Sequence, residues 1–150
     1  MANPLDEIFS KFESDLIAGP ASLKMITEAE TRLGTRFPPS YRYFLSRYGA
    51  AIGAGVSVPG LFHHPDEEEQ PLWTDVVTLN LKWVSQEARG NPPRYIAIGD
   101  DGTDYTYYLD TGAGDVECPV VVLGPGVDYV LIARNFTDYV AASCNGEISF

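Results

Sequence analysis

Two adjacent histidines are the residues best suited to metal binding or proton transfer in this chain. His63 and His64 are the only histidines, and Asp66 follows them closely. Neighbouring side chains on an extended segment point in opposite directions, so one ion would not readily take both imidazoles. A Cys-His or Ser-His-Asp centre would have to recruit one of them without any supporting local motif. We therefore expect a solvated loop here, with a weak metal site as the alternative.

An acidic cluster at residues 100–104 resembles a calcium loop at first sight. It reads Asp-Asp-Gly-Thr-Asp. A calcium loop that began at Asp100 would need Gly at its sixth position and Glu at its twelfth, and Tyr105 and Thr111 occupy those places. Asp and Gly are also the residues that tight hairpin turns require. The spacing therefore predicts a hairpin turn and no metal site.

The glycines of the chain form no phosphate-binding loop. The sequence has no GxxxxGK[ST] pattern, and no GxGxxG pattern opens a predicted helix. The Gly-Ala-Gly at 53–55 and the Gly-Pro-Gly at 124–126 are typical of turns. The many carboxylates offer pairs for acid–base hydrolysis, but no spacing selects one pair over another. We therefore expect no cofactor, and we do not expect an enzyme.

The charge of the chain is strongly negative and unevenly distributed. It has 21 acidic and 10 basic residues, which gives a formal net charge of -11. This argues against direct binding to nucleic acid or to anionic membranes, because both rely on basic patches. Residues 48–81 hold five acids and residues 95–133 hold seven, and neither window holds a Lys or an Arg. Such one-signed windows can steer a basic protein partner, and they can equally be a solvated surface.

The length and composition predict one soluble globular domain over residues 1–150. Hydrophobic residues make up 45% of the chain, which is enough for a core, yet no run of 18 apolar residues suggests a membrane span. The first residues carry acids and no basic region, so we expect no secretory signal and a cytoplasmic location. In that compartment Cys118 and Cys144 are expected to be reduced, with a disulfide as the less favoured alternative.

Three helices are predicted in the first third of the chain. Each has a capping residue at its start and a glycine at its end, and they are expected over residues 3–19, 22–34 and 38–49. Leu23 is expected on the apolar face of the second helix, for which Thr27 offers a later start.

Beyond residue 50 the pattern becomes mostly extended. Short extended pieces are expected at 52–62, and a polar, acidic loop at 63–71. A fourth helix is expected at 75–88, with Trp83 on its apolar face. Residues 76–79 have a strand as their alternative. Strands are expected at 95–98, 105–109, 118–123 and 129–132, followed by a helix capped by Asn135. Helices, then strands, then a helix favour an α+β fold with a mostly antiparallel sheet.

Three tyrosines lie close together on the second predicted strand. Strand alternation places Tyr105 and Tyr107 on one face and Tyr108 on the other. Tyrosine on a strand surface suits a protein interface, and core packing is the alternative.

Residues 22–49 carry a pattern that resembles a known family. The pattern reads Ile26-x3-Glu30-x2-Leu33-Gly34-x2-Phe37-Pro38-x2-Tyr41-x2-Phe44-Leu45-x3-Gly49. It strongly resembles the Smi1/Knr4 family, also called the SUKH superfamily. The later segments 96–110, 119–121 and 132–139 match in the same order. Tyr48 and Phe37 depart from the family's commoner Asn and Leu.

Most of this pattern predicts structure rather than a site. Core positions are expected for the apolar and aromatic members, which are Leu33, Phe37, Tyr41, Phe44 and Leu45. Gly34 is expected to adopt a left-handed conformation, and Glu30 to bond a backbone group at the helix junction. The resemblance implies a single SMI1/KNR4-like domain, with a mostly antiparallel sheet packed against N-terminal helices and a C-terminal helix.

The resemblance also implies a binding role without a cofactor. Bacterial members are similar to immunity proteins that bind and neutralise a cognate toxin domain, often a nuclease, inside the producing cell. Eukaryotic relatives resemble regulatory or scaffold modules. We therefore expect an immunity protein that occludes the active site of a basic, nuclease-type toxin. A regulatory or scaffold module is the alternative, and an enzyme or small-ligand binder is the least favoured.

The acidic windows supply the residues expected to contact the partner. Their carboxylates would act as a decoy for phosphate, and aromatic side chains would anchor the contact. The expected contact residues are Asp66, Glu67, Glu68, Glu69 and Trp73 first, and then Asp100, Asp101, Asp104 and Tyr107.

Overall fold

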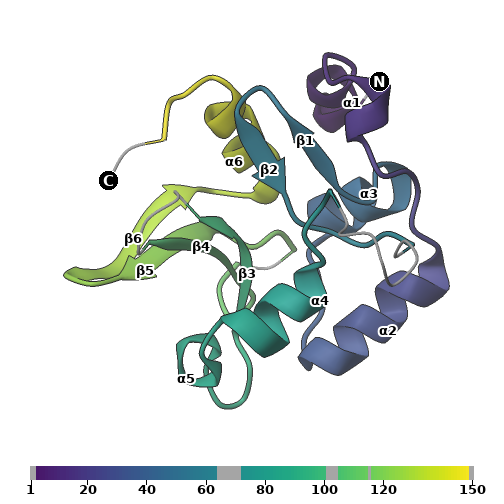
Figure 1. The fold of residues 1–150 in the computed structure, drawn as a ribbon. Helices are drawn as coiled ribbons and strands as arrows, with labels where there is room; N and C mark the ends of the chain where they lie inside the picture. Colours follow the sequence, from purple (N-terminus) through teal and green to yellow (C-terminus); the bar gives the residue numbers. More distant parts are fainter. Residues whose placement is uncertain (1–2, 64–71, 101–104, 115, 149–150) are drawn as a thin grey trace.

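Helices and a four-stranded antiparallel sheet form the two halves of the structure (Figure 1). The computed structural model describes residues 3–63, 72–100, 105–114 and 116–148. The elements are α1 (Pro4–Phe9), η1 (Ser14–Leu16), α2 (Leu23–Leu33), α3 (Pro39–Arg47), β1 (Ala51–Gly53), β2 (Val56–Val58), α4 (Val76–Thr78), η2 (Leu79–Trp83), α5 (Gln86–Arg89), β3 (Tyr95–Asp100), β4 (Thr106–Asp110), β5 (Val120–Gly124), β6 (Val127–Ala133) and α6 (Phe136–Cys144). The predicted α+β class is confirmed. Within these described ranges, no helix has the length and apolar character needed to cross a bilayer.

The first helix is shorter than predicted. Asn3 caps it as expected, because its Oδ1 accepts a hydrogen bond from the Leu5 N–H at 2.9 Å. The helix ends after Phe9, so the prediction that it continues to residue 19 is wrong. Beyond one 3-10 turn, Ile17 forms an antiparallel bridge with Ala51 at the start of β1. This tertiary pairing overrides the helical spacing of the apolar residues.

The second and third helices match their predictions closely. Ser22 caps α2 through a hydrogen bond from the Met25 N–H at 3.2 Å, so the later start is wrong. Leu23 was expected on the apolar face, but it is 69% exposed at the first turn. Gly34 ends α2 with φ 74°, and Gly49 follows α3 with the same φ. A Cβ at Gly49 would lie 2.1 Å from the Gly19 carbonyl oxygen, so this close approach requires glycine.

The fourth predicted helix is interrupted. Asp75 caps α4 as expected, accepting hydrogen bonds from the N–H groups of Val77 and Thr78, and the strand alternative is wrong. The chain then widens into the π-helical turn η2, becomes extended at Val84 and re-enters a helix as α5. The widened turn holds Asn80, which is fully buried against the edge of β3. We attribute the end of regular α-helix after α4 to these hydrogen bonds between the Asn80 side chain and Ala97 in β3.

The predicted hairpin at residues 95–109 is formed by β3 and β4. Ile98 is an extra residue in β3, because Ala97 pairs with Tyr108 while Gly99 pairs with Tyr107. Tyr107 packs in the main core with Ile98, whereas Tyr108 packs on the opposite face of the sheet. The opposite orientation of these two tyrosines is confirmed, and both are core residues. β5 and β6 extend the sheet, with bounds within two residues of those predicted.

The main core lies between the helices and one face of the sheet. All the apolar motif residues predicted as core are at most 4% exposed, namely Leu33, Phe37, Tyr41, Phe44 and Leu45. The ring of Tyr41 meets that of Phe136 in α6 at 4.9 Å, edge to face. The family pattern therefore joins the N-terminal helices to the C-terminal helix.

Candidate functional site

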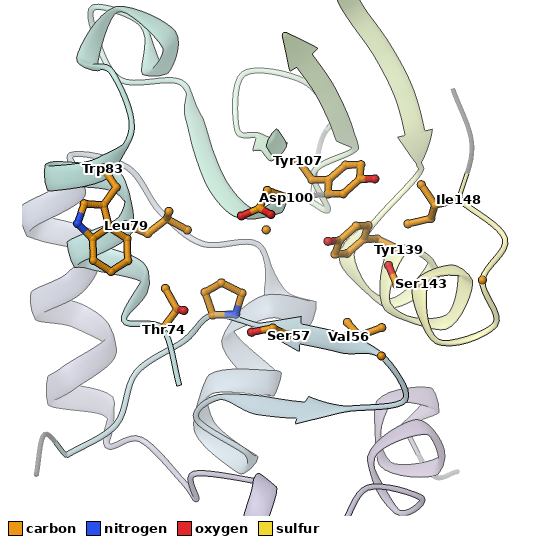
Figure 2. Close-up of a pocket in the computed structure, with 14 residues that line it drawn as sticks. Val56, Ser57, Thr74, Leu79, Trp83, Asp100, Tyr107, Tyr139, Ser143 and Ile148 are labelled. Carbon is orange, nitrogen blue, oxygen red and sulfur yellow. The ribbon is translucent and has the colours of Figure 1, made fainter. Parts of the chain in front are cut away.

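β1 and β2 pair as an antiparallel hairpin, and a cleft of about 550 Å³ opens between this hairpin, the β3–β4 hairpin and α6 (Figure 2). Its 14 lining residues come from β2 and its turn, the segment around Thr74, η2, the end of β3, one position of β4, and α6 with the residues after it. None of these lining residues is Lys, Arg or His. The cleft therefore has no cationic group among the described residues that line it.

The cleft lies where the two base-free windows of the sequence meet. The window at 48–81 contributes Val56, Ser57 and Leu79 to its walls. The window at 95–133 contributes Asp100 and Tyr107. Residues 82–94 separate the two windows in sequence, and the packing of β2 and η2 beside the end of β3 brings them together in space (Figure 2).

The bulge at the end of β3 shapes the floor of the cleft. A Cβ at Gly99 would lie 2.9 Å from the hydroxyl oxygen of Tyr139, so glycine leaves room for that hydroxyl. The next residue, Asp100, is exposed and projects between Leu79 on one side and Tyr107 and Tyr139 on the other (Figure 2). The extra residue in β3 thus aims a carboxylate into the cleft.

The tyrosine wall of the cleft is uncharged. The ring centroids of Tyr107 and Tyr139 are 5.5 Å apart. Burial raises the pKa of Tyr139 well above its usual value, and a hydrogen bond with Ser143 opposes this in part. Among the described lining residues, Asp100 is the one Asp or Glu.

The opposite wall carries an exposed tryptophan. Trp83 ends η2 and is 65% exposed, although the sequence placed it on the apolar face of a continuous helix. The π turn changes the direction of the side chains that follow Asn80, which turns Trp83 outward. The sequence gives no signal for this residue as part of a site, nor for Tyr139 and Ser143 in α6.

The structure brings together two of the expected contact residues, Asp100 and Tyr107. Trp73 lies outside the cleft: its indole N–H donates to the Leu16 carbonyl at 2.9 Å, and its ring is 5.8 Å from that of Phe62. It therefore anchors the segment before α4 to η1. The remaining expected contact residues lie outside the described residues, and these are Asp66, Glu67, Glu68, Glu69, Asp101 and Asp104.

The described residues assemble no metal cluster. His63 is exposed, while His64 lies outside the described part of the chain. No group of three or more His, Cys, Asp or Glu side chains suited to a metal ion occurs in the ranges that the structure describes. Both cysteines are free, as expected, and burial raises the pKa of Cys118 to about 11, so its thiol is protonated at neutral pH.

An ion pair with a buried carboxylate and a half-exposed arginine lies apart from the cleft, where β4 ends. Asp110 is fully buried and accepts two hydrogen bonds from Arg94, with 2.6 Å to Nε and 2.9 Å to Nη2. The Tyr129 hydroxyl and the Gly112 N–H also donate to this carboxylate. Burial alone would raise the pKa of Asp110, but these hydrogen bonds together lower it below its usual value. The pair fastens the turn after β4 to the start of β3.

One family model matches most of the chain. It is described as SMI1 / KNR4 family (SUKH-1), and it matches residues 20–142. The matched range includes α2 and α3, the four-stranded sheet β3–β6 and most of the residues that line the cleft. No curated protein matches the chain.

Proposed function

The chain belongs to the SMI1/KNR4 (SUKH-1) family, and from that premise we propose that it is an immunity protein. It binds a cognate bacterial toxin domain in the cytoplasm of the producing cell and neutralises the toxin by occluding its active site. The observation that carries this proposal is the cleft at the meeting point of the two base-free windows.

The partner we propose is a basic, nuclease-type toxin. A nuclease holds phosphates in a cationic groove, and an acidic protein associates rapidly with such a groove and competes with the nucleic acid. The net charge of -11 supports this choice, and so do the five and seven acids of the two windows that hold no Lys or Arg. We propose two acidic contact groups, residues 66–69 and residues 100–104, with Tyr107 in the cleft wall. Trp73, which we also propose as a contact, holds the segment before α4 to η1.

The test uses the protein encoded immediately upstream of this gene, where the proposal expects the cognate toxin. Affinity is measured for the wild-type protein, for the triple variant E67Q/E68Q/E69Q and for D100N. A matched control, E13Q/E28Q, removes two exposed charges from the helical half. We expect each contact variant to weaken binding at least tenfold and the control to change it less than twofold, because remote exposed charges contribute little.

Two outcomes would contradict the proposal. If the wild-type protein does not bind the toxin, the immunity role is wrong, and the regulatory or scaffold role of the same family is favoured. If E67Q/E68Q/E69Q and D100N both bind as tightly as the wild-type protein, the acidic contact surface is wrong.

A further inference from the structure

We propose that Trp83 is a contact residue for the toxin, and that a Lys or Arg side chain of the toxin packs over its indole ring. The identity of the partner rests on the proposed function. Trp83 lies between the two base-free windows of the sequence, and its ring forms part of the cleft wall.

The Trp83 indole has no bonding role within the described chain. It is 65% exposed, and among the residues that the structure describes it forms no hydrogen bond and no contact with another aromatic ring. Trp73, the other tryptophan, does both, because its N–H donates to the Leu16 carbonyl and its ring packs against that of Phe62. Trp73 therefore stabilises the fold, whereas the ring face and the N–H of Trp83 are accessible to a partner.

The turn that presents Trp83 is tied to the sheet. The buried Asn80 side chain fixes η2 to β3, because it bonds both the N–H and the carbonyl of Ala97. At the end of the turn the Val84 N–H donates to the Leu79 carbonyl at 3.0 Å. A side chain on an ordered backbone loses little freedom on binding, and tryptophan is among the residues that contribute most to binding energy. Trp83 therefore has the properties of an energetically important contact.

The charge of the chain favours a cationic occupant. The net charge is -11, and none of the described residues that line the cleft is Lys, Arg or His. The face of an indole ring is electron-rich and attracts cations more strongly than other aromatic side chains do. Two arginines of this chain stack on tyrosines in this way, but no cation of the described residues lies over the Trp83 ring. The ring can therefore receive a Lys or Arg from a basic partner.

Lys82 allows the sign of the occupant's charge to be tested. It precedes Trp83 in η2 and is exposed. Its positive charge repels a cation over the neighbouring ring, so removing that charge should strengthen toxin binding. An anionic group of the partner would instead be attracted by Lys82, and removing the charge would weaken binding. A gain of affinity also cannot result from a damaged fold.

The test measures how tightly the protein encoded immediately upstream binds the wild-type chain and four variants. W83L keeps an apolar side chain without a ring, W83F keeps a smaller ring, and K82Q removes the neighbouring charge. The control L23A shortens a side chain that is 69% exposed in the helical half. We expect W83L to weaken binding about tenfold and W83F about threefold, K82Q to strengthen it about twofold at low salt, and L23A to leave it unchanged.

Three results would overturn the inference. Binding of W83L as tight as that of the wild-type protein would show that the ring is not a contact. Equal losses in W83L and W83F would show an apolar contact, and weaker binding of K82Q would show an anionic one. Urea unfolding should give W83L the stability of the wild-type protein, because the ring is exposed.

Fluorescence quenching tests the charge at Trp83 without the toxin. The signal of Trp83 is the difference between the wild-type protein and W83F, because Trp73 is the other tryptophan of the chain. Relative to free N-acetyl-tryptophanamide, we expect caesium to quench Trp83 about twice as efficiently as iodide at low salt, and this difference to vanish in about 1 M NaCl. More efficient quenching by iodide would overturn the cationic occupant.

The binding measurements separate this contact from the proposed function. If the wild-type protein binds the toxin and W83L and K82Q bind it equally well, the Trp83 contact is wrong while the immunity role stands. If the wild-type protein does not bind the toxin, the immunity role is wrong, and the toxin contact at Trp83 is wrong with it.

Discussion

The Glu30 side chain in α2 accepts a hydrogen bond from the backbone N–H of Phe37, with 2.7 Å between Oε2 and N. This bond closes the connection between α2 and α3. The Phe37 ring is 4% exposed and lies 5.1 Å from the Tyr41 ring. The polar member of the family pattern therefore holds the core aromatic residues in place, and it does so outside the cleft.

Removing this acceptor should destabilise the fold without affecting partner binding. We expect E30A to lower the free energy of unfolding by about 1–2 kcal/mol, because the Phe37 N–H loses its partner. E30Q keeps an oxygen acceptor and should cost less. Urea unfolding of the three proteins measures these differences.

Arg42 provides the control for Glu30. Its Nη2 is 3.8 Å from the Glu30 carboxylate, and its side chain is 41% exposed, so this ion pair should contribute little. We expect R42A to change the unfolding free energy by less than about 0.5 kcal/mol. If R42A cost as much as E30A, the ion pair rather than the hydrogen bond would be the stabilising contact.

Asn80 should be essential to the edge of the sheet. Its Nδ2 donates to the Val76 and Ala97 carbonyls, and its Oδ1 accepts from the Ala97 N–H at 2.7 Å. We expect N80A to cost about 2–3 kcal/mol, because buried groups lose their partners, and to promote aggregation through the uncovered edge of β3. Q86A is the matched control, because it removes a single hydrogen bond from an exposed side chain to the Asn80 carbonyl. It should lower the free energy of unfolding by less than about 1 kcal/mol. Light scattering and urea unfolding report both effects, and equal behaviour of N80A and Q86A would contradict this role.

The Asp110–Arg94 pair should make stability depend on pH in acid. The folded state lowers the pKa of Asp110, so its contribution is present above the unfolded pKa of about 3.9 and is lost as the pH falls through the folded value. We expect D110N to lower the free energy of unfolding by about 2 kcal/mol at pH 7. The difference in unfolding free energy between D110N and the wild-type protein should become smaller below about pH 4. The exposed D128N is the control. A gap of the same size at pH 3 and pH 7 would show that the charge of Asp110 does not matter.

The contact between Gly99 and Tyr139 should appear as coupling in a double-mutant cycle. We expect G99A to destabilise the wild-type protein by about 1 kcal/mol, because the new Cβ would lie 2.9 Å from the Tyr139 hydroxyl oxygen. In the Y139F background that oxygen is gone, and G99A should cost clearly less. Thermal unfolding of the four proteins measures the cycle, and additive costs would show that the two residues do not meet.

The features predicted correctly from the sequence are those set by local chemistry. Asn3, Ser22 and Asp75 each cap a helix, because the oxygen of a short polar side chain can accept a hydrogen bond from a free N–H of the first turn. The alternation of Tyr107 and Tyr108 likewise follows from strand geometry.

The errors occur where a distant part of the chain decides the local structure. The pairing of Ile17 with Ala51 ends the first helix early, and Asn80 interrupts the fourth by bonding to β3. That interruption also exposes Trp83. The cleft could not be predicted for the same reason, since it exists only once β2, β3 and α6 have come together.

Inhibition of the neighbouring toxin in a purified assay tests the immunity role most directly. The toxin is held at a fixed concentration well above its Kd for this protein, and its catalytic activity is followed as the protein is added. We predict a linear loss of activity that reaches zero at one equivalent, with D100N giving weaker inhibition. Full toxin activity in the presence of a tenfold excess of the wild-type protein would contradict the immunity role.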